Sequence, residues 1–197
     1  MPSRPKLAQI IEKAGEMFTK YGYEKVSMDA ISAAVPVSKA TLYNNFKDKK
    51  ELFTEVISAR CNAIMGDMIQ ALEKETSVDA ALRKIGVKFL NMILLPDSLK
   101  IHRIIAAEQA EFPEMAMLFY KSGPARLSGL LENYLREQDK LGNIKAADPA
   151  LSAQMFLSMI KGYIHMQCLF GLRKDVTVPE RKKIIEHAVG IFLTGHR

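Results

Sequence analysis

One short stretch of the sequence carries side chains that can bind the base edges and the phosphates of DNA. Asn44 can form two hydrogen bonds with an adenine edge, and the methyl groups of Ala40 and Thr41 can contact a thymine methyl. Tyr43 and Lys47 can hold phosphate oxygens. These residue types, so close together, indicate recognition of a nucleic acid.

The same residues share one face of the helix that this stretch predicts. With Leu42 pointing inward and each residue turning the helix by roughly 100°, Phe46 lies beside Leu42 on the buried face. The outward positions are Ala40, Tyr43, Asn44 and Lys47, with Thr41 on the flank. A merely solvated face, the alternative, is more typically rich in Glu and Lys.

Three further residues stand at expected helix starts, where free backbone amides and the positive end of the helix dipole attract phosphate. They are Ser27, Ser38 and Lys49. The simpler interpretation is ordinary N-capping for the two serines and a solvated charge for the lysine. We expect the capping whether or not the chain binds DNA.

Helices must position these residues, because helical periodicity runs through almost the whole chain and no window shows sustained strand alternation. Apolar residues recur at helical spacing from Leu7 to Tyr21, and Gly22 is a typical C-cap. Two short helices are expected next, one from Ser27 to Ala34 and one from Ser38 through Phe46. The turn between them, Val35 to Val37, has helix-turn-helix dimensions.

A long helix is expected to follow and to run to about Lys74, opened by a capping box of the form Asp48-x-x-Glu51. The remaining expected helices span 77–94, 97–110, 113–139 with a break near Gly123-Pro124, 149–170 and 179–193. The predicted fold class is therefore all-α. A three-helix N-terminal head is joined by a long helix to a C-terminal helical bundle.

Composition and charge limit the classes of protein to which this chain can belong. The 197 residues carry a formal charge of +6 and are 48% hydrophobic, which excludes disordered and disulfide-dense chains. Residues 1–50 hold nine basic and five acidic side chains. Both a polyanionic partner and a solvated lysine face fit this bias.

Cofactor, metal and membrane binding are not expected. Cys61 and Cys168 form no CxxC motif or Cys/His cluster, which argues against a metal site. No apolar run reaches the roughly 18 residues that a membrane span needs, and the start of the chain shows no targeting signal. We therefore expect a cytoplasmic protein.

The segment from Val37 to Leu52, preceded by Ser27-Met28-Asp29-Ala30-Ile31, resembles the DNA-binding signature of TetR-family transcriptional regulators. The resemblance covers about residues 6–66, and its Thr-Leu-Tyr-x-x-Phe-x-x-Lys core is specific. It implies a DNA-binding head and a divergent helical body that binds a small ligand and forms a homodimer. The expected DNA-contacting residues are Ser27, Ser38, Lys39, Ala40, Thr41, Tyr43, Asn44, Lys47 and Lys49.

The body shows a weaker resemblance, to AefR-like C-terminal domains. The resemblance lies in the run Ala107-Glu108-Gln109-Ala110-Glu111-Phe112-Pro113-Glu114, followed by residues 119–124. We therefore expect a helix-turn-helix DNA-binding domain over residues 6–66 and a ligand-binding and dimerisation domain over residues 67–197.

A ligand pocket is expected between the long helices of the body, because Met-rich linings adapt to varied apolar ligands. The candidate ligand-binding residues are Phe89, Met92, His102, Phe112, Met117, Met159, Tyr163 and Met166. Each of them also fits the simpler interpretation of a core residue. The effector is expected to be a small, largely apolar molecule, and its identity is open.

The segment 149–170 is apolar on most faces, and a helix buried all round needs more neighbours than one small body provides. Together with the final helix it is the candidate for a two-fold homodimer interface of four helices. The alternative is simple burial within a monomer.

These features predict a ligand-responsive transcriptional repressor that binds a palindromic double-stranded DNA operator as a homodimer. Repression is an expectation from the family, because a dimer on an operator most simply blocks polymerase. The alternative function is a helical ligand-binding module without DNA-binding activity. An enzyme is not expected, because the sequence lacks a Gly-rich phosphate loop, a nucleophile elbow and a close His/Cys or His/Asp set.

Overall fold

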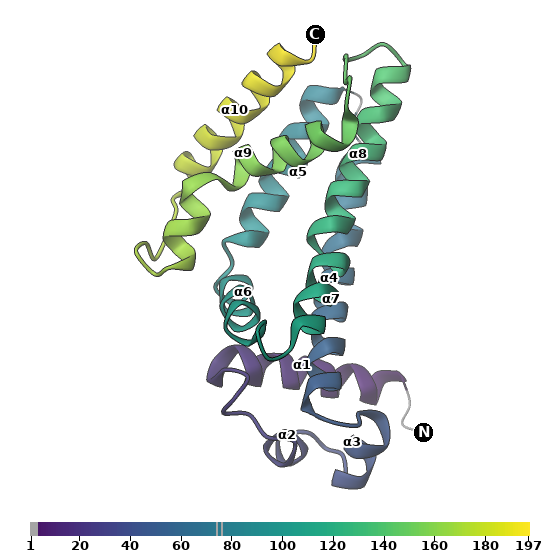
Figure 1. Cartoon of the computed structure of the whole chain (residues 1–197), viewed down its shortest axis with the longest axis vertical. Helices are drawn as coiled ribbons and strands as arrows, with labels where there is room; N and C mark the ends of the chain where they lie inside the picture. Colours follow the sequence, from purple (N-terminus) through teal and green to yellow (C-terminus); the bar gives the residue numbers. More distant parts are fainter. Residues whose placement is uncertain (1–3, 74, 76) are drawn as a thin grey trace. The chain divides into compact units, whose positions relative to one another are not determined.

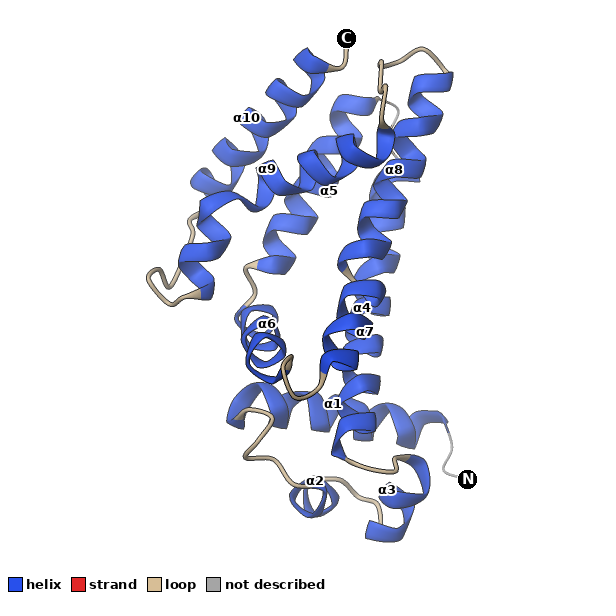
Figure 2. Ribbon diagram, viewed as in Figure 1, coloured by secondary structure: helices blue, strands red, loops and turns tan. Residues whose placement is uncertain are grey.

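The computed structural model describes residues 4–73, 75 and 77–197 and builds them from α-helices joined by turns and loops (Figures 1 and 2). The helices are α1 (Arg4–Tyr21), α2 (Met28–Ala34), α3 (Lys39–Asn45), α4 (Lys49–Glu73), α5 (Val78–Ile93), α6 (Pro96–Glu108), α7 (Pro113–Ser122), α8 (Pro124–Lys140), α9 (Pro149–Leu169) and α10 (Val178–Gly195). The described residues contain no β-strand. The all-α prediction is confirmed.

The chain forms two compact units. Unit 1 is Met1–Asn62 together with Lys100–Ser122, and unit 2 is Ala63–Leu99 together with Gly123–Arg197. The chain therefore leaves the first unit within α4, returns to it within α6 and leaves again after α7. The expected functional domains, 6–66 and 67–197, stay a prediction, and these compact units are a separate structural division.

The first three helices end and begin as their cap residues predict. Gly22 closes α1 with a positive φ of 86°, and its N–H donates to the Phe18 carbonyl at 2.9 Å. The Ser27 hydroxyl accepts from the Ala30 N–H at 3.1 Å, and the Ser38 hydroxyl accepts from the Thr41 N–H at 3.1 Å. Local sequence therefore sets where α2 and α3 start.

The connection between α2 and α3 is a tight turn. The Val37 N–H donates to the Val35 carbonyl at 2.8 Å, which makes a γ-turn centred on Pro36. Val35 itself is buried, so the turn is held against the core of unit 1. Because proline fixes its own φ, the turn stiffens the link between the two short helices.

The start of α4 differs slightly from the predicted capping box. The Asp48 carboxylate accepts from the Glu51 N–H at 2.8 Å, as expected. The returning bond comes from the Lys47 N–H, which donates to the Glu51 carboxylate at 2.6 Å, one residue earlier than in a standard box. This bond ties the first turn of α4 to Lys47, the residue that follows Phe46, the C-cap of α3.

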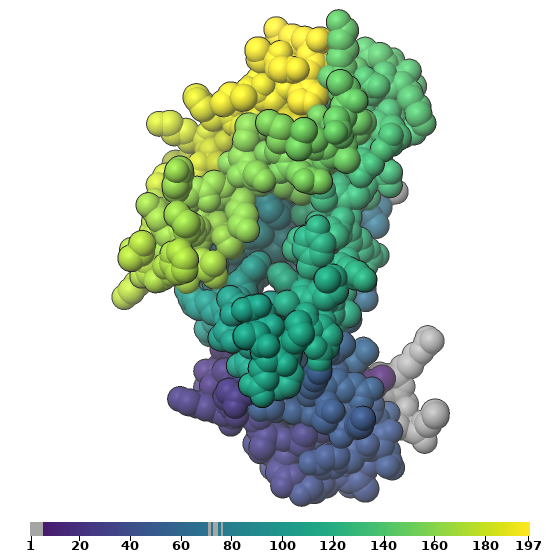
Figure 3. All heavy atoms as spheres, in the orientation of Figure 1, coloured from purple at the N-terminus to yellow at the C-terminus, as the bar shows by residue number. Residues whose placement is uncertain are grey.

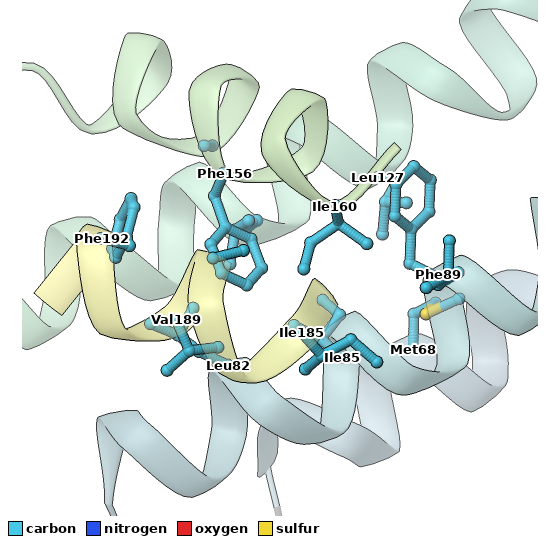
Figure 4. Packing of buried hydrophobic residues seen from close by; sticks show 14 of the residues in the cluster. Met68, Leu82, Ile85, Phe89, Leu127, Phe156, Ile160, Ile185, Val189 and Phe192 are labelled. Atoms are coloured by element: carbon cyan, nitrogen blue, oxygen red, sulfur yellow. The ribbon is translucent and has the colours of Figure 1, made fainter. Parts of the chain in front are cut away.

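The core of unit 2 joins the second half of α4 with α5, α8, α9 and α10 (Figure 4). Phe156 and Ile160 of α9 point toward α10, where Ile185 lies. A Cβ at Gly86 would stand 3.3 Å from both Ile160 and Ile185, so this glycine allows α5 to approach both helices closely.

Two interruptions shape the C-terminal half of the chain. The expected break near Gly123-Pro124 is confirmed, because α7 ends at Ser122 and α8 begins at Pro124. The expected uninterrupted helix over 149–170 is kinked instead, because Gly162 has a φ of 43° and a ψ of −160°. Glycine tolerates this conformation because it lacks a Cβ.

The end of α10 is tied to α9 and to the loop that follows α8. The His196 ring stacks on Phe192 with centroids 4.0 Å apart, and its Nδ1 lies 2.8 Å from the Phe192 carbonyl oxygen. Its Nε2 lies 2.8 Å from the hydroxyl of the buried Ser152, and its carbonyl accepts from the Lys145 N–H. A single residue, through its ring and its backbone carbonyl, thus joins three segments.

Replacing His196 with alanine should lower the free energy of unfolding by about 1–2 kcal/mol, because the buried Ser152 hydroxyl would lose its ring partner. Thermal unfolding followed by circular dichroism measures the change. Arg197→Ala is the matched control, since it alters the adjacent exposed residue and should leave the midpoint unchanged. Equal midpoints for both variants would contradict the assigned role.

Candidate DNA-binding surface

The outward face of α3 is exposed as the periodicity predicts. Leu42 is fully buried and Phe46 is nearly so, and they anchor the helix in the core of unit 1. On the outward face of α3 the exposed residues are Ala40, Tyr43 and Asn44, with Thr41 half-buried on the flank. Lys47, predicted on the same helical face, is exposed but lies beyond Phe46, the extended C-cap residue that ends α3. Because adjacent side chains present an amide, a phenol and an ammonium group, this face can reach both bases and phosphates. Contact with DNA stays a prediction.

The two capping serines remain on the surface. Ser38 has its hydroxyl 2.8 Å from the Thr41 hydroxyl, and both Ser27 and Ser38 are exposed. Each hydroxyl already accepts a backbone N–H, so an incoming phosphate would meet an ordered helix start. Asn45, which the sequence did not single out, donates from its amide to the Thr41 carbonyl at 2.7 Å and so helps to order α3.

Lys39 is engaged in an ion pair. Its Nζ lies 2.6 Å from a carboxylate oxygen of Asp29, which links α3 to α2. The hydrogen bond that Lys39 donates to the Asp29 carboxylate raises the pKa of Lys39 above its ordinary value. Both side chains are exposed, so a DNA phosphate could compete with Asp29 for the ammonium group.

Lys49 has a partner within the head itself. Its Nζ donates to the Tyr23 carbonyl at 3.0 Å and lies 4.2 Å from the centre of the Tyr23 ring. Burial raises the pKa of Tyr23 to about 12, so the ring stays a neutral phenol at ordinary pH. The sequence could not reveal this pairing, because Tyr23 precedes Lys49 by 26 positions and no local pattern connects them.

The candidate ligand-binding residues divide between the two units. Phe89, Met92 and Met159 belong to the hydrophobic cluster of unit 2, while Tyr163 and Met166 of α9 are exposed, Tyr163 to 80%. The remaining three lie in unit 1: His102, Phe112 and Met117. The His102 ring meets the Phe119 ring edge-on at 5.1 Å. The structure therefore gathers three of the eight in one cluster, and ligand binding by any of them stays a prediction.

Within the described part of the chain, no group of three or more His, Cys, Asp or Glu side chains could hold a metal ion. No described helix is both long enough and apolar enough to cross a membrane. Cys61 and Cys168 are both buried, and neither forms a disulfide.

Family models match both parts of the chain. Residues 10–56 match the model of the bacterial regulatory proteins of the tetR family. Residues 80–196 match the model of the AefR-like transcriptional repressor C-terminal domain. The chain belongs to the TetR family of transcriptional regulators. TetR proteins bind DNA through a helix-turn-helix, which in this chain is formed by α2 and α3.

Similar proteins cover the whole length of this TetR-family chain. YvkB of Bacillus subtilis (strain 168), an uncharacterized HTH-type transcriptional regulator, is 28% identical over 98% of this chain and 97% of its own. The solved structure of the flavonoid-responsive regulator FrrA is 32% identical, covers 99% of this chain and 98% of its own, and has a TM-score of 0.83. A TetR-family regulator from Mesorhizobium loti MAFF303099 has a TM-score of 0.92 at 22% identity, covers 99% of each chain and shares the fold.

Two kinds of variant should separate phosphate contacts from base contacts on this TetR surface. Tyr43→Ala and Lys47→Ala should weaken binding to every duplex, and loss of the Lys47 contact should reduce the slope of log K against log salt by about 0.9. Asn44→Ala should mainly relax sequence preference, by about 1–3 kcal/mol at one base position.

Fluorescence anisotropy with specific and random duplexes at several salt concentrations measures both effects. Lys140→Ala, which removes the same charge from an exposed position on α8, is the control and should bind as the wild type does. Wild-type affinity in a Tyr43→Ala/Lys47→Ala double variant would disprove the assignment of α3 as the recognition helix.

Proposed function

We propose that the protein is a cytoplasmic homodimeric repressor that binds a palindromic operator and is released from it by a small, largely apolar effector. The observation that carries this proposal is the outward face of α3, where Tyr43 and Asn44 are exposed while Leu42 is buried, with Lys47 exposed just beyond the end of the helix. Membership of the TetR family supports DNA binding, and the match to an AefR-like repressor domain supports repression. A catalytic role is not part of the proposal.

Exposed apolar side chains on α9 and α10 support the homodimer. Both helices form part of the surface of unit 2, in yellow-green and yellow in Figure 3. The large apolar residues that the single chain leaves exposed on these two helices are Leu151, Met155, Tyr163, Met166, Val178 and Ile191. Packing α9 and α10 against the same helices of a second copy would bury this area and form a four-helix contact.

The shape of α10 favours a second copy as the occupant. A shallow hollow of about 400 Å³ is lined by Glu186, His187, Gly190, Ile191 and Thr194. Around Gly190 there is open space where a side chain would be, so another helix can approach the backbone closely. Ile191 lines the hollow and is 58% exposed. In a two-fold dimer, Ile191 of one copy could fit into the hollow of the other copy.

A homodimer would link two DNA-binding heads, so that both bind or leave the operator together. Two heads separated by roughly 34 Å match half-sites one helical turn apart, so the operator should be palindromic. An effector that changes the separation of the heads weakens both contacts together, and a shift of about 3 kcal/mol changes affinity more than a hundredfold.

The side chains of the unit 2 core and two similar proteins support two classes of effector. Phe89, Met92 and Met159 supply aromatic and thioether groups in and around the unit 2 core, which suit an apolar or aromatic molecule. FrrA, which is flavonoid-responsive, supports a planar aromatic effector for this chain as well. A long-chain acyl group is the second candidate, because FadR of Bacillus subtilis, a neighbour in fold, was solved with stearoyl-CoA.

Ile191→Arg should convert the dimer into a monomer, because it would place a charge in an apolar interface. Light scattering at micromolar concentration should then give 22.1 kDa for the variant and twice that mass for the wild type. Leu141→Arg, the same kind of change at an exposed position after α8, should stay dimeric. A wild-type mass of one chain would disprove the homodimer.

Selection of bound duplexes from a random pool should enrich a palindrome whose half-site spacing reports the separation of the heads.

A flavonoid aglycone added to the complex with the selected duplex should lower the affinity for DNA more than a hundredfold. Met92→Ala should reduce that response and keep the DNA affinity of the effector-free protein. Long-chain acyl-CoA is the parallel arm of the titration. Wild-type protein without salt-sensitive binding to the pool would favour a ligand-binding module that does not bind DNA.

A further inference from the structure

An exposed ion pair links the two helices of the helix-turn-helix. Helices α2 and α3 lie side by side (Figures 1 and 2), and the Lys39 Nζ lies 2.6 Å from a carboxylate oxygen of Asp29. Asp29 stands in the first turn of α2, and Lys39 is the first residue of α3. The pair therefore joins the first turns of both helices on the surface proposed to bind DNA.

Asp29 is an unfavourable residue for a surface that meets a polyanion. From Ser27 to Lys47 the sequence contains one acidic residue, Asp29, and two basic residues, Lys39 and Lys47. The carboxylate thus offsets half of the positive charge of this segment. Because like charges repel, an exposed carboxylate beside phosphates weakens binding unless another interaction compensates for it.

The start of α2 is capped without the Asp29 side chain. The Ser27 hydroxyl accepts from the Ala30 N–H at 3.1 Å, whereas the Asp29 carboxylate pairs with Lys39. The simpler interpretation of Asp29 is its favourable interaction with the dipole of α2. That interpretation predicts that removing the charge destabilises α2 and weakens DNA binding.

Lys39 is occupied before DNA arrives. Its ammonium group donates to Asp29, and Tyr43, one turn further along α3, lies close enough to influence its charge. A lysine can act as a point charge toward a phosphate oxygen, but this one first has to leave a carboxylate. Binding of a phosphate by Lys39 is therefore an exchange of one anion for another.

The exchange is feasible because the pair is exposed. The Lys39 side chain is 60% exposed and that of Asp29 is 61% exposed, and ion pairs in such positions are weak. A phosphate can therefore displace the carboxylate. The displaced Asp29 then remains as an unpaired negative charge near the DNA, so both the lost pair and the new repulsion lower the affinity.

The cost should be the same for every DNA sequence. The competition concerns the Lys39 ammonium group and a phosphate oxygen, and all duplexes carry the same phosphates. The groups available for base contacts, such as the Asn44 amide, take no part in it. A residue that acts in this way changes affinity and leaves sequence preference unchanged.

We infer that Asp29 is an internal competitor of DNA phosphate for Lys39 and limits the affinity of the head for every duplex. In the free protein the carboxylate holds the ammonium group, and on DNA a phosphate replaces it. The inference rests on the proposed function, since it needs binding to DNA. A weaker phosphate contact shortens each encounter with non-operator DNA, which greatly outnumbers the operator in a genome.

Asp29→Asn should tighten binding to the selected operator and to a random duplex alike, about fivefold at about 50 mM salt, because Lys39 no longer has to leave a carboxylate. The gain should fall below about twofold at about 0.5 M salt, where screening weakens the pair and the repulsion. Fluorescence anisotropy measures both effects. Damage to α2 cannot imitate this result, because it would lower the affinity.

Two outcomes of this titration would contradict the inference. Affinity at low salt that is equal to or weaker than that of the wild type would show that Asp29 does not compete with phosphate. A changed ratio between operator and random duplex would assign Asp29 to base contact instead.

A second background tests whether Asp29 acts through Lys39. Lys39→Gln alone should weaken binding and reduce the slope of log K against log salt by about 0.9. Adding Asp29→Asn to Lys39→Gln should tighten binding less than about twofold, because the group for which the anions compete is gone. Equal gains in both backgrounds would mean that Asp29 acts by repulsion alone, and would overturn the competition.

Glu16 offers the matched control. It pairs with Lys13 at 2.8 Å on α1, in the same compact unit, and both side chains are partly exposed. Glu16→Gln removes the same charge and should keep the wild-type affinity within about 1.5-fold. A gain equal to that of Asp29→Asn would assign the effect to the net charge of the head and overturn the role of Asp29.

An NMR titration of the Lys39 side chain tests the pair without DNA. The hydrogen bond to Asp29 raises the pKa of Lys39, so Asp29→Asn should lower that pKa toward the ordinary value of lysine. Equal pKa values in both proteins would overturn the inference even if the protein binds its operator. Wild-type protein that shows the raised pKa but no salt-sensitive binding to any duplex would disprove the proposed function, and the inference with it.

Discussion

The packing of Tyr23 against Phe18 and Phe53 is the contact on which the DNA-binding head depends. Phe18 meets Phe53 edge-on at 5.0 Å, and Tyr23 meets both rings within 6 Å. These rings join the end of α1, the loop before α2 and the first half of α4. Helices of seven residues such as α2 and α3 are marginal in isolation. The face that we propose to read DNA therefore owes its geometry to this aromatic core, to which α3 and its C-cap add Leu42 and Phe46.

Local sequence was sufficient to predict much of this head. The N-caps Ser27 and Ser38, the C-cap Gly22 and the inward direction of Leu42 each depend on residues within one helical turn, and all are confirmed. The partners of Lys49 and Lys50 could not be predicted in the same way. Tyr23 and Glu114 lie far from them along the chain, and nothing in a local pattern distinguishes a lysine that meets a distant carboxylate from one that faces solvent.

The same limit applies to α9. Its sequence is apolar on most faces, which predicted burial on all sides but not which residues one chain covers. The structure buries Phe156 and Ile160 and leaves Met155 and Tyr163 exposed. The kink at Gly162 separates the two halves of the helix, and no neighbouring residue signals it, because a glycine in an apolar helix is equally compatible with a straight backbone. Contacts with a partner and kinks depend on how the whole molecule packs, so the local sequence does not reveal them.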